Sequence, residues 1–178
     1  MRGDSRQELV EATLVALIRV GPMRVHPKDI CEELGVSKAL VNYHFGGRDG
    51  LLAEAIVLGY QRYVDTLWEA AERAGSDPVK RLLAWVDRQI LWTCENAGLA
   101  AALSFPRFSF DLPAETAEVT TKEFTVAGGR HFANLQRLVA DARRALAVGS
   151  DQSSEEQADR AVTGALDAAL IGWLAVGV

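Results

Sequence analysis

The segment from Pro27 to Leu52 carries polar side chains whose types and spacing suit contact with a nucleic acid. Its sequence is PKDICEELGVSKALVNYHFGGRDGLL. A helix that begins near Lys38 places Val41 and Phe45, four residues apart, on one inner face. The outer faces then carry Lys38, Ala39, Asn42, Tyr43 and His44.

These outer residues offer the chemistry that a DNA groove requires. Lys and Asn reach base edges or phosphates, Tyr and His donate to phosphate oxygens, and a small Ala lets the helix approach closely. We expect Arg48 and the amides that start the following helix to form a phosphate site. The predicted DNA-contacting residues are Ser37, Lys38, Ala39, Asn42, Tyr43, His44 and Arg48. For Tyr43, packing against the preceding helix is the alternative to a phosphate contact.

Two short helices and a tight turn must position this surface. Pro27 suits the first position of a helix, because its missing N–H costs nothing there. Gly35 supplies the positive φ of a sharp turn, and Ser37 is placed to cap the next helix through its hydroxyl. The pattern predicts a helix-turn-helix over about residues 27–46. A plain helical hairpin is the alternative, but it does not explain the cluster of exposed polar residues.

An amphipathic helix from Leu9 to Gly21 precedes the motif and completes a three-helix module. Together with GVSKALVNYHFGGRDGLL, it resembles the TetR/AcrR family of bacterial one-component transcriptional regulators, without a gap from Leu9 to Leu52. The resemblance implies an all-helical, dimeric, DNA-binding protein with an effector pocket. The sequence departs from the family's pattern in three places. Val25 and His26 replace a helix-capping Thr, Leu40 replaces a Thr, and Asn42 replaces a Tyr.

Composition alone does not indicate DNA binding. The chain has 178 residues and a net charge of −5, and residues 1–60 hold 7 basic and 8 acidic side chains. Neutralisation of phosphates must therefore be local, with strong salt dependence. Cys31 and Cys94 are far apart and lie in no metal-ligand pattern, so we expect two buried thiols and neither a disulfide nor a zinc site.

The sequence contains none of the common catalytic motifs, and we expect neither an enzyme nor a bound cofactor or metal. The first residues lack the apolar core of a signal peptide. The apolar run Ala161–Val178 includes Asp167 and suits a membrane span poorly. We therefore expect a cytoplasmic protein that has no membrane partner.

The remainder of the chain reads as helices, so the fold class is all-α, with about nine helices. A helix from Asp49 to about Ala74 would connect two domains, residues 1–50 for DNA binding and 51–178 for effector binding and dimerisation. Further helices are predicted over Pro78 to about Glu95, from Leu99, from Pro113 to about Val148 with a bend at Gly128–Gly129, and from about Glu155. The helix from Pro78 carries a wide apolar arc, with Trp85 and Trp92 on one face and an adjacent face made of Val79, Leu82, Leu83, Val86, Ile90 and Thr93, so we expect it to be central.

Several aromatic residues in the second domain could line an apolar effector pocket, with ordinary core packing as the alternative. The predicted ligand-binding residues are Trp85, Trp92, Phe105, Phe108, Phe110 and His131. Apolar stripes over about residues 119–148 and 155–178 predict a homodimer through those segments. The predicted function is a homodimeric repressor that a small molecule releases from palindromic operator DNA. A helical dimeric interaction module without regulated DNA binding is the alternative.

Overall fold

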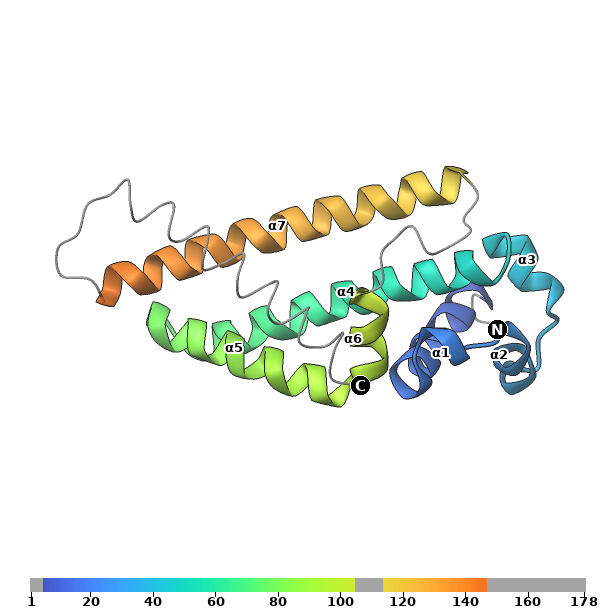
Figure 1. The fold of residues 1–178 in the computed structure, drawn as a ribbon, viewed down its shortest axis with the longest axis horizontal. Coiled ribbons are helices and arrows are strands. Elements are labelled where there is room, and N and C mark those ends of the chain that lie inside the picture. Colours follow the sequence, from blue (N-terminus) through green and yellow to red (C-terminus); the bar gives the residue numbers. More distant parts are fainter. Residues whose placement is uncertain (1–4, 105–113, 147–178) are drawn as a thin grey trace. The chain divides into compact units, whose positions relative to one another are not determined.

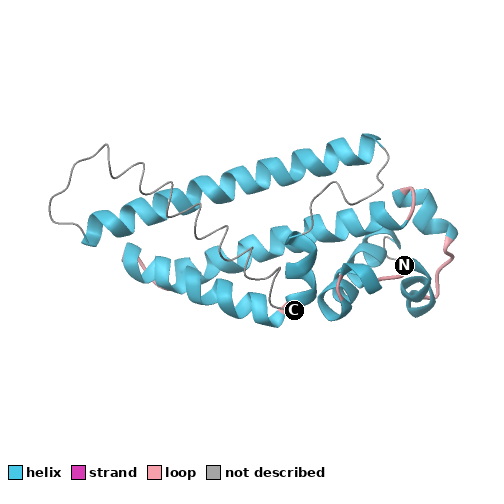
Figure 2. Cartoon of the chain, in the orientation of Figure 1, coloured by secondary structure: helices cyan, strands magenta, loops and turns pink. Residues whose placement is uncertain are grey.

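The structure is a computed structural model that describes residues 5–104 and 114–146. These residues form seven α-helices and one short 3-10 helix, with no strand among them (Figure 2). The all-α prediction is confirmed. The chain divides into two compact units, residues 1–61 with 96–125 and residues 62–95 with 126–178.

Most helix bounds lie close to the predicted ones (Figure 1). The helices are α1 Ser5–Val20, η1 Pro22–Arg24, α2 Pro27–Leu34, α3 Ala39–Phe45, α4 Arg48–Arg73, α5 Pro78–Glu95, α6 Ala97–Ser104 and α7 Ala114–Leu146. α7 runs through Gly128 and Gly129 as one helix. Residues 105–113 and the predicted last helix, from about Glu155, lie outside the described residues.

α1 is the central helix of the first unit. It contacts α2, α3 and α6, and its Leu9, Leu14 and Leu17 are almost fully buried. The prediction that this helix covers the motif helices is confirmed. The burial of Val41 and Phe45 from α3 and of Leu51 and Leu52 from α4 completes the core.

The backbone of α6 lies directly against α1. A Cβ atom added to Gly98 would lie 2.2 Å from the Leu17 carbonyl oxygen and 2.7 Å from that of Ile18. Only glycine fits so close an approach without a backbone shift. α6 thus supports the helix that covers the helix-turn-helix, although it follows α5 of the second unit in sequence.

The second unit has its core between α4, α5 and α7. α5 turns Trp85, Gln89, Trp92 and Thr93 inward, whereas Leu83 and Ile90 are 59% and 44% exposed. Of the two predicted apolar faces of α5, the one that carries the indoles is buried, whereas the other is buried only at Thr93. The indoles at positions 85 and 92 bury more apolar area than the aliphatic residues would, and they set the rotation of the helix.

The same rotation exposes Cys94, which corrects the prediction that both thiols are buried. Cys31 is buried as predicted. Burial raises the pKa of the Cys31 thiol, and the nearby positive charge of Lys38 acts in the opposite direction.

The apolar stripe of α7 packs within its own chain. Leu135, Val139 and Ala142 are at most 2% exposed. This stripe cannot also meet a second copy, so the interface predicted for residues 119–148 would have to use another face of the helix. Among the described residues, no helix is long and apolar enough to span a bilayer.

Candidate DNA-binding surface

The turn between α2 and α3 is closed by backbone hydrogen bonds around Gly35. Gly35 has φ 65°, and its N–H donates to the Glu32 carbonyl at 3.3 Å. The Val36 N–H donates to the Cys31 carbonyl at 3.0 Å. These bonds form a Schellman motif, which needs a residue that tolerates a positive φ. The predicted role of Gly35 is confirmed.

The Ser37 hydroxyl accepts the Ala39 N–H at 3.2 Å, as predicted for a capping residue. α3 itself begins at Ala39, with Lys38 in the flanking position and making no side-chain cap bond. Ser37 therefore satisfies a backbone donor at the start of α3 and leaves the Lys38 side chain to solvent.

The two faces of α3 are as predicted. Val41 and Phe45 are 1% and 3% exposed and anchor the helix in the first unit. The exposed residues at its other faces are Ser37, Lys38, Ala39, Asn42 and Tyr43. One side of α3 is therefore fixed by burial, and the other is free for a partner.

The rings of α3 are unequally exposed. Tyr43 is 82% exposed, so the alternative in which it packs against α2 is not supported. His44 is half-buried, with its ring centroid 4.9 Å from that of Tyr43 and 5.9 Å from that of Phe45. The His44 imidazole therefore lies beside both the exposed ring of Tyr43 and the buried ring of Phe45.

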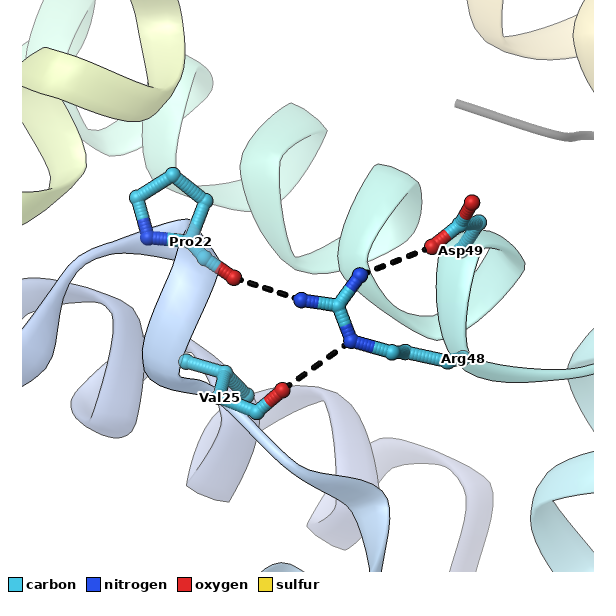
Figure 3. Close-up of polar contacts among 4 residues, drawn as sticks. All are labelled: Pro22, Val25, Arg48 and Asp49. Carbon is cyan, nitrogen blue, oxygen red and sulfur yellow. Dashed lines mark hydrogen bonds and ion pairs between the residues drawn. The ribbon is translucent and has the colours of Figure 1, made fainter. Parts of the chain in front are cut away.

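Arg48 has a different role from the one predicted. Its Nε donates to the Val25 carbonyl at 3.1 Å, its Nη2 to the Pro22 carbonyl at 2.6 Å, and its Nη1 to Asp49 Oδ1 at 2.9 Å (Figure 3). The guanidinium is turned toward the unit's own backbone. Arg48 therefore braces the segment before α2 against the start of α4, and we propose no phosphate contact for it.

The sequence-based set omitted two cations near the start of α2. Arg24 ends η1 and is exposed, and Lys28 lies in the first turn of α2. Lys28 pairs with Glu32 at 3.6 Å, but both side chains are well exposed, so the pair is weak and open to exchange. In helix-turn-helix motifs the first helix crosses the DNA backbone. The positions of Arg24 and Lys28 near the start of α2 could therefore have identified both as candidate phosphate contacts.

His26 is the N-cap residue of α2 and makes no side-chain cap bond. It stands where the family's pattern usually has a capping Thr. Val25 is 2% exposed, and its carbonyl accepts from Arg48. Of the two positions that lack the capping hydroxyl, Val25 thus serves packing and the Arg48 brace, whereas His26 is exposed.

Three of the predicted ligand-binding residues come together in the second unit. Trp85, Trp92 and His131 are 0%, 6% and 4% exposed. The Trp85 and His131 ring centroids lie 5.8 Å apart, and the Trp92 ring packs against that of Tyr63 in a tilted arrangement, with the centroids 4.5 Å apart. Phe105, Phe108 and Phe110 lie outside the described residues.

Comparison with known proteins finds a family model described as bacterial regulatory proteins, tetR family, over residues 9–55. Over 51 residues the chain is 41% identical to the HTH-type transcriptional regulator BetI of Vibrio vulnificus. That match spans 29% of this chain and 26% of the relative, so the chain matches about a quarter of that curated relative's length.

Two solved structures share the fold along most of the chain. A putative transcriptional regulator from Pseudomonas aeruginosa has a TM-score of 0.63 at 25% identity, covering 95% of this chain and 78% of the other. The TetR family transcriptional regulator PfmR from Thermus thermophilus has a TM-score of 0.58 at 24% identity, covering 93% and 85%. The sequence likeness is concentrated around the helix-turn-helix, while the likeness of fold extends over both units.

Proposed function

This chain belongs to the TetR family of bacterial regulatory proteins, and we propose that it is a homodimeric repressor that releases operator DNA when a small molecule binds. One observation carries the DNA-binding part. α3 is held from behind by Val41 and Phe45, while Lys38, Asn42 and Tyr43 are exposed. A short, rigidly held helix with a polar outer face fits the major groove.

Each exposed residue has a role in this proposal. Lys38 and Asn42 reach base edges, and the small Ala39 lets the backbone approach the groove. Ser37, Tyr43 and His44 contact phosphates, together with Arg24 and Lys28 near the start of α2. Phosphate contacts fix the register of the protein, and base contacts select the sequence.

The operator in this proposal is palindromic. A two-fold homodimer presents two copies of α3 to half-sites that lie about one DNA turn, roughly 34–36 Å, apart. We propose residues 1–50 as the DNA-binding domain and 51–178 as the effector-binding and dimerisation domain, with residues 155–178 and an outer face of α7 in the interface. The cell compartment is then the one that holds the DNA, the cytoplasm.

Two connections along the chain can carry the ligand response. α4 starts in the first unit and ends in the second, and α5 leads into α6 after a single residue. α6 in turn packs on α1 through Gly98. A ligand that shifts α4 or α5 thereby changes the separation of the two recognition helices. A coupling of about 1–3 kcal/mol alters operator affinity roughly 5–150-fold.

The alternative is a helical interaction module that does not bind DNA in a regulated way. The acidic balance of residues 1–60 favours it, because non-specific DNA binding depends on positive charge. The two functions differ in what selection from random-sequence duplex DNA would recover. A repressor recovers a two-fold symmetric sequence whose complex resists competitor DNA and weakens with salt. An interaction module recovers no common sequence.

Ligand response is tested by titrating the selected DNA with and without each small molecule that raises the melting temperature of the full chain. We expect the hit to weaken operator binding, and operator to weaken binding of the hit by the same factor. A hit with identical affinity in the presence and absence of operator would leave a DNA-binding protein without the proposed regulation.

A further inference from the structure

Three buried side-chain nitrogen atoms of the second unit lack a hydrogen-bond partner among the described residues. They are Nε of Arg81, Nε1 of Trp85 and Nε2 of His131, and the last two belong to neighbouring rings. Trp85 is 0% exposed and His131 is 4% exposed. Their rings lie nearly parallel, with an interplanar angle of 26° and a centroid separation of 5.8 Å. Two unpaired nitrogens thus lie on facing rings from different helices.

Both atoms are donors. The indole N–H of Trp68 donates to Nδ1 of His131 at 3.1 Å, so Nδ1 holds a lone pair. Burial lowers the pKa of His131 to about 4, which keeps the imidazole neutral at pH 7. The proton of the neutral ring is then on Nε2, and the indole Nε1 of Trp85 always carries one.

Two donors cannot satisfy each other. A buried donor left without an acceptor costs about 1–3 kcal/mol, and native proteins seldom keep one without a reason. On α5, Oε1 of Gln89 accepts from the Tyr63 hydroxyl. The missing partner of the pair must be an acceptor.

We propose that Trp85 and His131 together bind an acceptor oxygen of the effector, so that the effector is an apolar molecule with a carbonyl or carboxylate group. This inference rests on the proposed ligand response and adds the chemistry of the ligand. One oxygen with two lone pairs can accept from both N–H groups. The surrounding rings of Tyr63, Trp68 and Trp92 supply apolar walls.

The same rings suggest a competing ligand chemistry. Aromatic side chains grouped around a site bind quaternary ammonium ions through cation–π interactions. A cation has no lone pair to offer, however, and it would leave both N–H groups unpaired. Two unpaired N–H donors therefore favour an acceptor oxygen over a cation.

The test uses the full chain, labelled with ¹⁵N, and four small probes. Acetophenone and benzoate carry the acceptor oxygen, ethylbenzene lacks it, and tetramethylammonium is the cation. We expect acetophenone or benzoate to move the Trp85 indole N–H resonance downfield and to bind at least tenfold more tightly than ethylbenzene. Tighter binding of acetophenone would indicate a neutral carbonyl on the effector, and tighter binding of benzoate would indicate a carboxylate.

Two variants locate the effect. Trp85→Phe keeps an aromatic ring but removes the donor, and we expect it to reduce the affinity of the acceptor probes to that of ethylbenzene. It also identifies the Trp85 resonance by its loss. The control is Leu91→Ala on the same helix, whose side chain is 54% exposed, and which should leave all four affinities unchanged.

Three results would overturn the inference. They are tighter binding of tetramethylammonium, equal affinity for ethylbenzene and acetophenone, and a Trp85 indole resonance that no acceptor probe moves. Failure of the proposed function looks different. In that case an acceptor probe binds at Trp85 as expected, but the affinity of the chain for its selected DNA does not change.

Discussion

Nη2 of Arg48 lies 2.6 Å from the carbonyl oxygen of Pro22, across 26 residues of sequence. The same guanidinium reaches the Val25 carbonyl, so one side chain joins both ends of the segment before α2 to the first turn of α4. Its hydrogen bonds to backbone carbonyls separate this stabilising residue from the neighbouring α3 residues that we propose contact DNA.

Replacing Arg48 should therefore affect stability before it affects recognition. We expect Arg48→Ala to lower the free energy of unfolding by about 1–3 kcal/mol, since it removes charge-assisted hydrogen bonds to backbone carbonyls. Urea denaturation measures the loss. In Arg48→Gln, which removes the charge, the salt slope of DNA binding should match that of the unmodified chain. A salt slope reduced by about one would instead support the predicted contact between Arg48 and a phosphate.

Lys38→Ala and Asn42→Ala should weaken operator binding and leave the fold intact. Both side chains are exposed, and each should cost about 1–3 kcal/mol of specific affinity if it reads a base edge. Fluorescence anisotropy at fixed salt measures the affinity, and circular dichroism measures the helical content. Arg144→Ala, which removes an exposed charge from α7, is the control for Lys38. Unchanged affinity in both α3 variants would rule out this reading surface.

Gly98→Ala should destabilise the first unit. The added Cβ would lie 2.2 Å from the Leu17 carbonyl oxygen, so α6 must move away from α1, at a cost of about 1–3 kcal/mol. Gly129→Ala in α7 is the matched control, because nothing lies within 4 Å of its added Cβ. There we expect a gain of about 0.5–1 kcal/mol from helix propensity. Chemical denaturation of both variants gives the comparison, and equal effects would contradict the close α1–α6 packing.

The stability of the chain should fall as the pH drops from 7.5 to 5. Burial lowers the pKa of His131 to about 4 from an ordinary 6.5, so the unfolded state takes up a proton that the folded state does not. The contribution of His131 to the free energy of unfolding is complete above pH 6.5 and decreases as the pH falls toward 4. From these values we expect His131 to account for about 2 kcal/mol between pH 7.5 and 5. The decrease should be smaller by that amount in His131→Phe, and equal slopes would show that the folded state also protonates.

A homodimer that uses the predicted last stripe should dissociate when a charge enters it. We expect Trp173→Glu to convert a dimer to a monomer, because a buried unpaired carboxylate is strongly unfavourable at an interface. Sedimentation velocity of the full chain measures the change. Leu91→Glu, on the exposed side of α5, is the control. If the dimer persisted in Trp173→Glu but dissociated in Leu91→Glu, the dimer interface would lie on α5 instead.

Local rules predicted the helix-turn-helix well. The positive φ of Gly35 and the Ser37 hydroxyl act within a few residues of where they stand, so their roles follow from residue type and spacing. The faces of α3 follow equally from the i, i+4 spacing of Val41 and Phe45. These features need no knowledge of the rest of the fold.

Long-range choices could not be derived in the same way. α5 has apolar residues around most of its circumference, and which face becomes buried depends on the helices packed against it. Arg48 finds acceptors 23 and 26 residues away, and no local pattern indicates them. The pairing of Trp85 with His131 likewise joins helices far apart in sequence.

The unequal exposure of the two cysteines makes the chain easy to label at one place. Cys94 is open to solvent, while Cys31 is buried and its pKa is raised by that burial, so a maleimide dye or spin label will react at Cys94. Cys94 stands at the end of α5, just before the chain passes into α6. A dimer labelled there carries one probe in each subunit without any engineered cysteine. The distance between the two probes then reports directly, by electron–electron resonance or energy transfer, on whether effector and DNA select different arrangements of the dimer.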